Sequence, residues 1–260
     1  MMKIYRYGEV SNDEIFARPD MKTGVEDVVA DIIANVRAKG DEALFEYCRK
    51  FDQADLDTLE VSEAEIDEAF DVVGDFRRVL ERAAANIRKF HEKQLRNSFI
   101  INDEDGIVMG QKVIPMDKAG LYVPGGTAAY PSTVLMDAVP AKIAGVGELV
   151  ITTPPGPDGK VNPYVLAAAK VAGVDRILKV GGAQAIAALA YGTETVPKVD
   201  KIVGPGNAFV AEAKKMPPTW LTGSQRRTRS SSESQPMPPP TEAVQRSITP
   251  IFSVRGSSSS

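Results

Sequence analysis

The stretch Gly120-Leu-Tyr-Val-Pro-Gly-Gly126 ends an apolar run in glycines, and two stretches of the same kind follow within about a hundred residues. These are Val180-Gly-Gly-Ala-Gln-Ala-Ile-Ala-Ala-Leu-Ala190 and Lys201-Ile-Val-Gly-Pro-Gly-Asn-Ala-Phe-Val210. Glycines at such turns let backbone N–H groups approach a ligand at the N-terminus of the helix that follows. The three turns therefore predict a ligand site.

Strand and helix patterns alternate from residue 119 onward. Apolar runs predict strands at 119–123, 149–152, 176–180 and 201–203, and the segments between them predict helices at 132–143, 163–171 and 183–191. Short connections of this kind form right-handed units with a parallel sheet that helices cover on both faces. We therefore expect an α/β fold with a Rossmann-like module at residues 118–215. Its ligands bind beyond the carboxyl ends of the strands, where the three turns would cluster.

The N-terminal portion, residues 1–117, is predicted to be helical and to end in a β-ribbon. Apolar residues at helical spacing predict a helix over 24–40, and Asp41 is expected to cap the next one. Ser62-x-x-Glu65 has the form of a capping box ahead of a third helix. A fourth runs over 76–94, with an expected inward face of Phe76, Val79, Leu80, Ala83, Ile87 and Phe90. Runs at 98–102 and 106–114 predict the ribbon.

The amino-acid composition limits the kinds of protein that this chain can be. The chain has 260 residues, 43% of them hydrophobic and 25% charged, which is typical of a soluble protein. A net charge of -4 gives no basic footprint for nucleic acid, and no apolar run approaches the roughly 20 residues that span a bilayer. The single cysteine cannot form an internal disulfide. We therefore expect a cytoplasmic protein with no nucleic-acid or membrane partner.

The last segment, residues 216–260, has a different composition. It holds eleven Ser, seven Pro and five Arg, against two Glu and no Lys or Asp. Residues 1–215 carry 26 basic and 33 acidic side chains, so the acidic charge belongs to that part. A segment without periodic apolar residues cannot form a core, and we expect this tail to be disordered.

Two residues with reactive side chains are interpreted as structural. His91 is the only histidine, and it has no neighbouring Cys or second His that would suggest a metal site. Cys48 lies on the apolar side of a predicted helix without a basic neighbour placed to lower its pKa, which favours a packed core thiol over a nucleophile.

Three polar side chains at the glycine turns are candidate ligand contacts. Tyr122 precedes the first turn and could stack on a planar ligand or pack inward from its strand. Gln184 and Asn207 would each present an amide at the start of a helix, although Asn207 could equally serve as an N-cap. Neither the Gly-x-Gly-x-x-Gly spacing nor a Walker lysine occurs at these turns, so the generic nucleotide signatures are absent.

These stretches resemble histidinol dehydrogenase, the last enzyme of histidine biosynthesis. The resemblance also covers Pro131-Ser-Thr-Val-Leu-Met136, Asn86-Ile-Arg-Lys-Phe-His-Glu-Lys-Gln94 and Lys50-Phe-Asp52, and it spans residues 1 to about 215. It implies NAD-dependent oxidation of L-histidinol through L-histidinal to L-histidine by a homodimer with one zinc per site. It also places Tyr122, Gln184 and Asn207 at the positions that contact NAD.

The chain departs from the family pattern after Lys215. The resemblance implies that zinc ligands and proton-transferring residues follow this point, but the tail has no His and no Asp. Zinc needs three or four converging N, O or S ligands, and two isolated Glu cannot supply them. We therefore expect neither catalytic nor metal-binding residues in this chain, and a truncated product that is inactive alone. A frameshift would explain the change, and the nucleotide sequence after Lys215 would then encode Ala-Gly-Pro-Ser-Glu in another frame.

Two other interpretations remain open at the level of sequence. The chain could be a non-catalytic NAD-binding or regulatory protein that uses its Arg/Ser/Pro-rich tail for interaction, with phosphorylation of Ser230 to Ser232 beside Arg229 as a switch. Alternatively, it could be one half of a split enzyme whose catalytic half is a separate chain.

Overall fold

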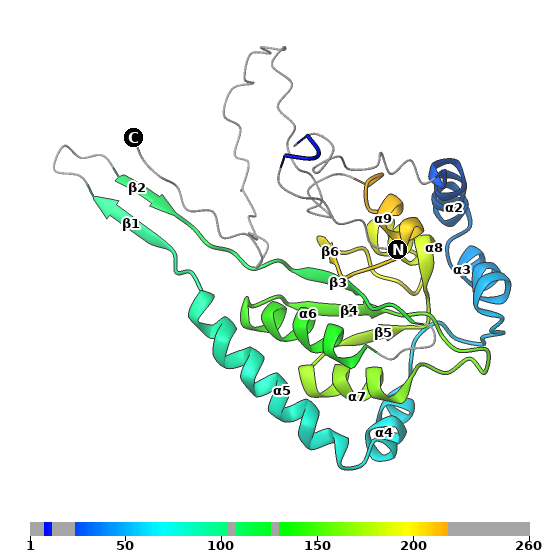
Figure 1. Cartoon of the computed structure of the whole chain (residues 1–260), viewed down its shortest axis with the longest axis horizontal. Coiled ribbons are helices and arrows are strands. Elements are labelled where there is room, and N and C mark those ends of the chain that lie inside the picture. Colours follow the sequence, from blue (N-terminus) through cyan, green and yellow to red (C-terminus); the bar gives the residue numbers. More distant parts are fainter. Residues whose placement is uncertain (1–7, 12–23, 103–107, 126–129, 218–260) are drawn as a thin grey trace, which may run out of the picture.

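The centre of the fold is a parallel sheet of four strands in the order β5-β4-β3-β6 (Figure 1). The computed structural model describes residues 8–11, 24–102, 108–125 and 130–217. The strands are β3 (Lys118–Tyr122), β4 (Glu148–Thr152), β5 (Arg176–Leu178) and β6 (Lys201–Val203). β3 pairs in parallel with both β4 and β6, which confirms the predicted parallel α/β sheet. β5 ends two residues before the predicted position 180.

Helices cover both faces of the sheet, as the sequence predicts. On one face lie α6 (Pro131–Ile143) and α7 (Pro163–Ala172), and on their outer side pack α4 (Glu63–Val72) and α5 (Phe76–His91) (Figure 1). Their contacts with the sheet form one apolar cluster, which includes Leu121, Leu135, Leu149, Ile151 and Leu166. The helical N-terminal portion is therefore packed against the sheet module.

The opposite face of the sheet is covered by α8 (Gly182–Tyr191). Outside it lie α2 (Glu26–Lys39), α3 (Asp41–Tyr47) and α9 (Ala208–Ala213). A second apolar cluster fills this side and includes Ile33, Leu44, Val150, Ile186, Leu189 and Ile202. Because α8 consists almost entirely of buried small and aliphatic residues, it fits closely between the sheet and α2.

The chain between α3 and α4 positions Asp52 at the end of the sheet. α3 continues into a π-helix, η1 (Cys48–Asp52), and the next residue, Gln53, has a left-handed backbone with φ of 56°. The chain then runs antiparallel along β5, where Val61 N donates to Ile177 O at 2.9 Å and Lys179 N donates to Leu59 O at 2.7 Å. This segment covers the edge of the sheet.

A β-ribbon projects from the body of the molecule (Figure 1). It follows a short 3-10 helix, η2 (Glu92–Gln94), and consists of the antiparallel strands β1 (Phe99–Asn102) and β2 (Val108–Gln111). Every residue of both strands is exposed, including Ile100 and Val108. The ribbon is confirmed, although residues 103–107 of the predicted second run and the turn lie outside the described residues.

Two details of the predicted helices are wrong. Asp41 does not cap α3, because Gly40 is the N-cap and makes no side-chain cap. Instead, the Asp41 carboxylate accepts hydrogen bonds from the hydroxyls of Thr193 and Thr195, each at 2.5 Å. On α5, Val79 and Phe90 were expected to face inward but are exposed, because α6 and α7 cover only the side of the helix that carries Leu80 and Ala84.

Other predictions for the N-terminal helices and the tail have different outcomes. The capping box at α4 is confirmed: Ser62 Oγ accepts from Glu65 N at 3.2 Å, and Glu65 Oε2 accepts from Ser62 N at 2.9 Å. The predicted disordered tail at 216–260 lies almost wholly outside the described residues. Within the part of the chain that the structure describes, no helix has the length and apolar character needed to cross a bilayer.

Candidate functional site

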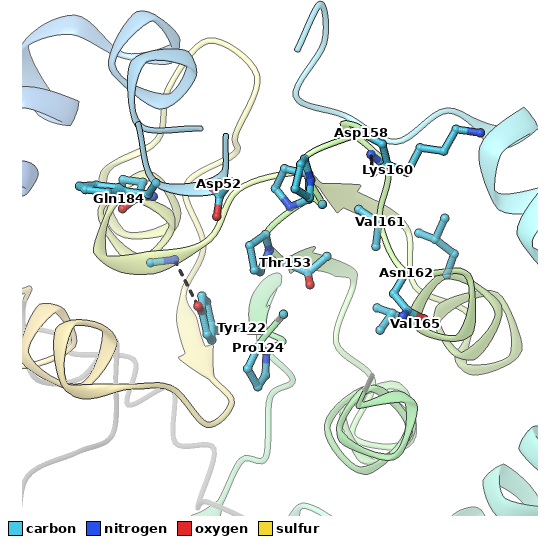
Figure 2. Close-up of a pocket in the computed structure, with 18 of the residues that line it drawn as sticks. Asp52, Tyr122, Pro124, Thr153, Asp158, Lys160, Val161, Asn162, Val165 and Gln184 are labelled. Carbon is cyan, nitrogen blue, oxygen red and sulfur yellow. Dashed lines mark hydrogen bonds between the residues drawn. The ribbon is translucent and has the colours of Figure 1, made fainter. Parts of the chain in front are cut away.

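A cavity of about 1180 Å³ opens at the carboxyl ends of the strands (Figure 2). Its wall includes Gly125 after β3, Thr153 after β4, Gly182 after β5 and Asn207 after β6. The three glycine turns therefore meet at one cavity, as predicted. Pockets that bind drug-sized molecules are typically about 300 to 1,000 Å³, so this one is large enough for an extended ligand.

The glycines at these turns are required by close packing around Pro154, which directly follows Thr153. A Cβ atom added to Gly125 would lie 2.3 Å from Pro154 Cγ, and one added to Gly181 would lie 2.6 Å from Pro154 Cβ. The turn after β4 is thus held between the turns after β3 and β5. The sequence did not single out this proline, because its partners lie about 30 residues away on either side.

The turn after β6 is joined to the same structure. Gly204 has φ of 111°, and a Cβ atom there would lie 2.1 Å from the carbonyl oxygen of Tyr122. Only glycine allows both this backbone conformation and this close approach. The end of β6 is therefore packed directly on the end of β3, which holds Tyr122 and Asn207 on one wall of the cavity.

Tyr122 is a buried residue whose hydroxyl reaches the start of α8. Its hydroxyl oxygen accepts a hydrogen bond from Gly182 N at 3.2 Å (Figure 2). Burial raises the pKa of the phenol and nearby Asp52 raises it further, while the Gly182 hydrogen bond lowers it. The net shift is upward, so the phenol keeps its proton at neutral pH. Because the oxygen accepts from Gly182, the phenolic proton can be donated to a ligand.

Gln184 lies in the first turn of α8 and is 2% exposed. Its side chain lies back over Gly182, where an added Cβ atom would be 2.6 Å from Gln184 Oε1. Gly182 also has a positive φ of 66°, so the turn needs glycine for two reasons. The amide of Gln184 is thereby fixed beside the N-terminus of α8, on the cavity wall.

Asn207 serves as the N-cap of α9. Its side-chain oxygen accepts from Val210 N at 3.1 Å, which is the alternative that the sequence left open. The residue is nevertheless exposed and lines the cavity. Capping occupies its oxygen and leaves the amide N–H₂ group as the donor that it can offer to a ligand.

Asp52 is a residue of the cavity that the sequence did not mark as a site residue. It ends η1 and lies on the same side of the cavity as Tyr122 and Gln184, whereas Asp158, Lys160 and Asn162 lie on the other side (Figure 2). Its Oδ2 atom is buried and has no hydrogen-bond partner among the described residues. Burial raises the pKa of this carboxyl to about 6.

The other charged residues of the wall are largely paired. Glu65 accepts from the buried Lys179 at 2.6 Å, and Lys160 lies 3.8 Å from Glu68. The hydrogen bond from Lys179 and the cap of Ser62 outweigh burial and hold the pKa of Glu65 below its ordinary value. The capping box of α4 therefore also places a carboxylate on the wall, a role that the capping pattern alone could not indicate.

Cys48 and His91 have structural surroundings. Cys48 is fully buried, its thiol lies 3.4 Å from the carbonyl oxygen of Lys179, and burial raises its pKa to about 12. A thiol with so high a pKa is not a nucleophile at neutral pH, which confirms the interpretation as a core residue. His91 is buried, and its Nδ1 lies 2.7 Å from Gln94 Oε1 at the end of α5, away from the residues that line the cavity.

The described residues do not fit a zinc site of the kind that the family resemblance implies. No group of three or more His, Cys, Asp or Glu side chains lies close enough together to hold a metal ion within residues 8–11, 24–102, 108–125 and 130–217. The acidic side chains on the cavity wall are Asp52, Glu65, Glu68 and Asp158, two of which are paired with lysines.

The chain matches known proteins over most of its length. The family model described as histidinol dehydrogenase matches residues 17–219. The chain belongs to the histidinol dehydrogenase family. It is 53% identical over 221 residues to the histidinol dehydrogenase of Clostridium acetobutylicum, covering 83% of this chain and 51% of that protein. It is 56% identical over 196 residues to the enzyme of Geobacter metallireducens, covering 74% and 45%.

A solved structure of this family has the same fold. The crystal structure of histidinol dehydrogenase from Elizabethkingia anophelis matches with a TM-score of 0.73 and 39% identity, over 76% of this chain and 46% of that one. The chain thus spans about half the length of the histidinol dehydrogenases it matches. The shared half contains the sheet and the cavity described above.

Proposed function

We propose that this chain forms the NAD-binding part of a histidinol dehydrogenase site, with the cavity at the strand ends as the place where the dinucleotide binds. In this family the reaction is the oxidation of L-histidinol through L-histidinal to L-histidine, in the biosynthesis of histidine. The observation that carries the proposal is that three glycine turns and three polar side chains, Tyr122, Gln184 and Asn207, line one large cavity.

Each of the three side chains has a distinct part in binding. Tyr122, held by Gly182 N, donates its phenolic proton to an oxygen of the dinucleotide. The amide of Gln184 is fixed at the start of α8 and pairs with polar groups of the cofactor. Asn207 caps α9 through its oxygen and offers its N–H₂ group. The glycine turns keep side chains away from the cofactor, so that backbone and ligand can approach closely.

When NAD is bound, its nicotinamide ring supplies the hydride acceptor for oxidation of an alcohol. Removal of the hydroxyl proton requires a base, which is most often a His or a carboxylate. His91 does not line the cavity, and Glu65 and Glu68 of its wall are paired with lysines, which leaves Asp52 and Asp158 as the described wall carboxylates without a lysine partner. Because the chain spans about half the length of the histidinol dehydrogenases it matches, we propose that it binds NAD but does not turn over L-histidinol alone, and that the zinc ligands and the homodimer typical of the family require residues beyond those described.

Weak binding of NAD to the isolated chain is the expected result. The described residues provide only part of the contacts with NAD. We therefore expect a dissociation constant on the order of 1 mM, which corresponds to a binding free energy of about -4 kcal/mol. Calorimetric titration with NAD measures it. Tyr122→Phe removes the donated hydrogen bond and should weaken binding about five-fold, consistent with roughly 1 kcal/mol for one hydrogen bond.

The matched control is Tyr164→Phe, the same chemical change at a half-exposed tyrosine of α7 that does not line the cavity. It should leave the affinity for NAD unchanged. Absence of saturable binding up to 10-fold above the expected constant would contradict the proposed site, and so would equal effects of the two substitutions. Micromolar binding would instead contradict the claim that half of the contacts are lacking.

A further inference from the structure

We propose that Asp52 accepts hydrogen bonds from the adenosine ribose of the cofactor and makes the cavity select NAD over NADP. This inference rests on the proposed function, since it assigns a specificity-determining residue within the same site. It concerns a side chain that lies about 70 residues before Tyr122 in the sequence and comes from outside the sheet.

The position of Asp52 is the first observation. Its carboxylate enters the cavity from η1, on the side where Tyr122 and Gln184 lie (Figure 2). Burial is the main cause of the raised pKa of Tyr122, and the charge of Asp52 adds to it. Because both side chains line the same side of the cavity, one ligand bound there can contact both (Figure 2).

The second observation is that Asp52 lacks a partner within the protein. Its Oδ2 atom is buried and receives no hydrogen bond from any residue that the structure describes. Nearly all buried polar atoms in proteins are hydrogen-bonded, and a buried carboxylate oxygen without a donor is costly. Asp52 as a whole is only partly buried and lines the cavity, so a ligand bound there can supply the missing donor. An acidic residue cannot serve the phosphates of a dinucleotide, so hydroxyl groups are the donors that fit.

The local backbone holds this carboxylate in place. Asp52 is the last residue of a π-helix, and Gln53 after it is the one non-glycine residue with positive φ among those described. π-helical turns are rare in proteins, and those that occur are often found at functional sites. A left-handed backbone is also unfavourable at a residue that has a side chain. The fold therefore maintains an unfavourable turn at the point where the side chain enters the cavity.

The charges on the cavity wall indicate which ribose-bearing cofactor fits. NAD carries two adjacent ribose hydroxyls where NADP carries a 2′-phosphate, and cofactor sites separate the two with an acid for the diol or an arginine for the phosphate. Among the described residues of this wall there are four acidic side chains, one lysine and no arginine. A 2′-phosphate beside Asp52 would meet repulsion from a like charge without a guanidinium to compensate it.

An apolar surface for the adenine ring adjoins this carboxylate. Phe51, the residue before Asp52, lines the cavity with its ring half exposed, and the ring also stacks in parallel on Tyr47 at 5.4 Å between ring centroids. Val28 and Ile32 of α2 complete the apolar wall. An apolar surface next to a hydrogen-bonding carboxylate suits a nucleoside, whose base and sugar have the same arrangement.

The test compares the affinities of the intact chain and its variants for NAD and NADP, measured by ligand-observed NMR titration. We expect the unmodified chain to bind NAD at least ten-fold more tightly than NADP. Asp52→Asn keeps the shape of the side chain and removes its charge, so the ratio should fall to within about three-fold. Asp52→Ser removes the charge with a smaller side chain and should give the same change, and melting followed by circular dichroism confirms that each variant folds.

Asp55→Asn is the control. Asp55 lies three residues away, is exposed, and carries the same charge, but its carboxylate faces Arg49 at 3.5 Å outside the cavity. This variant should keep the NAD preference of the unmodified chain. An unchanged preference in Asp52→Asn, or equal affinity of the unmodified chain for the two cofactors, would overturn the inference while leaving the NAD site intact. Failure of the unmodified chain to bind NAD would overturn the proposed function as well.

Discussion

A second carboxylate, Asp137 of α6, is buried without a hydrogen-bond partner among the described residues for its Oδ2 atom. Burial raises its pKa to about 6, although the nearby ammonium of Lys214 works in the opposite direction. Lys214 itself donates to the carbonyl oxygen of Gly204 at 2.5 Å, next to the turn that carries Asn207. The charge of Lys214 therefore lies beside the turn that follows β6.

The raised pKa makes Asp137 a source of pH-dependent instability. In the unfolded chain an aspartate titrates near pH 4. Between that value and about 6 the native state holds more protons than the unfolded state, so the free energy of unfolding falls as the pH rises through this range. Above about pH 6 the loss of stability caused by the buried Asp137 carboxylate no longer changes with pH.

Asp137→Asn should remove this penalty. We expect the variant to be more stable than the unmodified chain by about 1 kcal/mol at pH 7 and to match it near pH 4. Urea unfolding at the two pH values measures the difference. Asp57→Asn makes the same change at an exposed residue and should have little effect on the free energy of unfolding at either pH. A variant of Asp137 that is no more stable at pH 7 than at pH 4 would show that its carboxylate is better solvated than the structure indicates.

At the scale of single residues, the sequence predicts the cavity residues that lie at glycine turns better than the cavity residues that packing brings there from distant segments. Tyr122, Gln184 and Asn207 could be singled out because each adjoins a glycine turn whose pattern is local. Asp52 and Pro154 could not, because nothing in their own surroundings marks them. Asp52 reaches the cavity because η1 lies against the segment before α8, where the Cys48 thiol donates to Lys179 O, and Pro154 is fixed by two glycines in other turns.

At the scale of elements, the β-ribbon stands out because every residue of its two strands is exposed. An isolated two-stranded ribbon is marginally stable in water, yet this one carries Phe99, Ile100, Ile101, Val108 and Met109, each more than half exposed. The exposed Val79 and Phe90 of α5 add to the apolar surface of the chain. Contiguous exposed apolar surface promotes association.

Replacing Ile100 with lysine should therefore improve solubility. Ile100 is 75% exposed, so Ile100→Lys removes apolar surface without affecting the core. We expect less binding of a hydrophobic dye and a shift toward monomer in light scattering, while the melting temperature changes little. Affinity for NAD serves as the internal control, since the ribbon does not line the cavity. Low dye binding and a monomeric state already in the unmodified chain would contradict this view of the ribbon.

The sequence predicts elements well where the pattern is strongly periodic. The helices α2, α4, α5 and α8 lie where apolar spacing and the capping box indicate, because these signals are local. The face that each helix buries depends on its neighbours, and for this reason Val79 and Phe90 were assigned wrongly. Similarly, Asp41 has the chemistry of a cap, but Thr193 and Thr195 approach it from the far end of α8 and bind its carboxylate instead.

At the scale of the whole molecule, the order of strands is what brings the three turns together. β3 lies between β4 and β6, so the turns after β3 and β6 are neighbours, and β5 lies beyond β4. Alternating strand and helix patterns predict a parallel sheet but not this order, which depends on packing between distant segments. The sequence therefore predicts that a ligand site lies at the strand ends. Which residues line that site depends on the strand order and on packing between distant segments.

NMR on the ¹⁵N-labelled chain can locate bound NAD on the molecule. We predict that the amide signals of Gly125, Gly181, Gly182 and Gly206 shift on titration with NAD, because these residues form the turns around the cavity, whereas that of Gly110 in the ribbon stays in place. Saturable binding that leaves the four glycine signals unchanged, or that shifts Gly110 instead, would contradict the claim that the three turns form the NAD site.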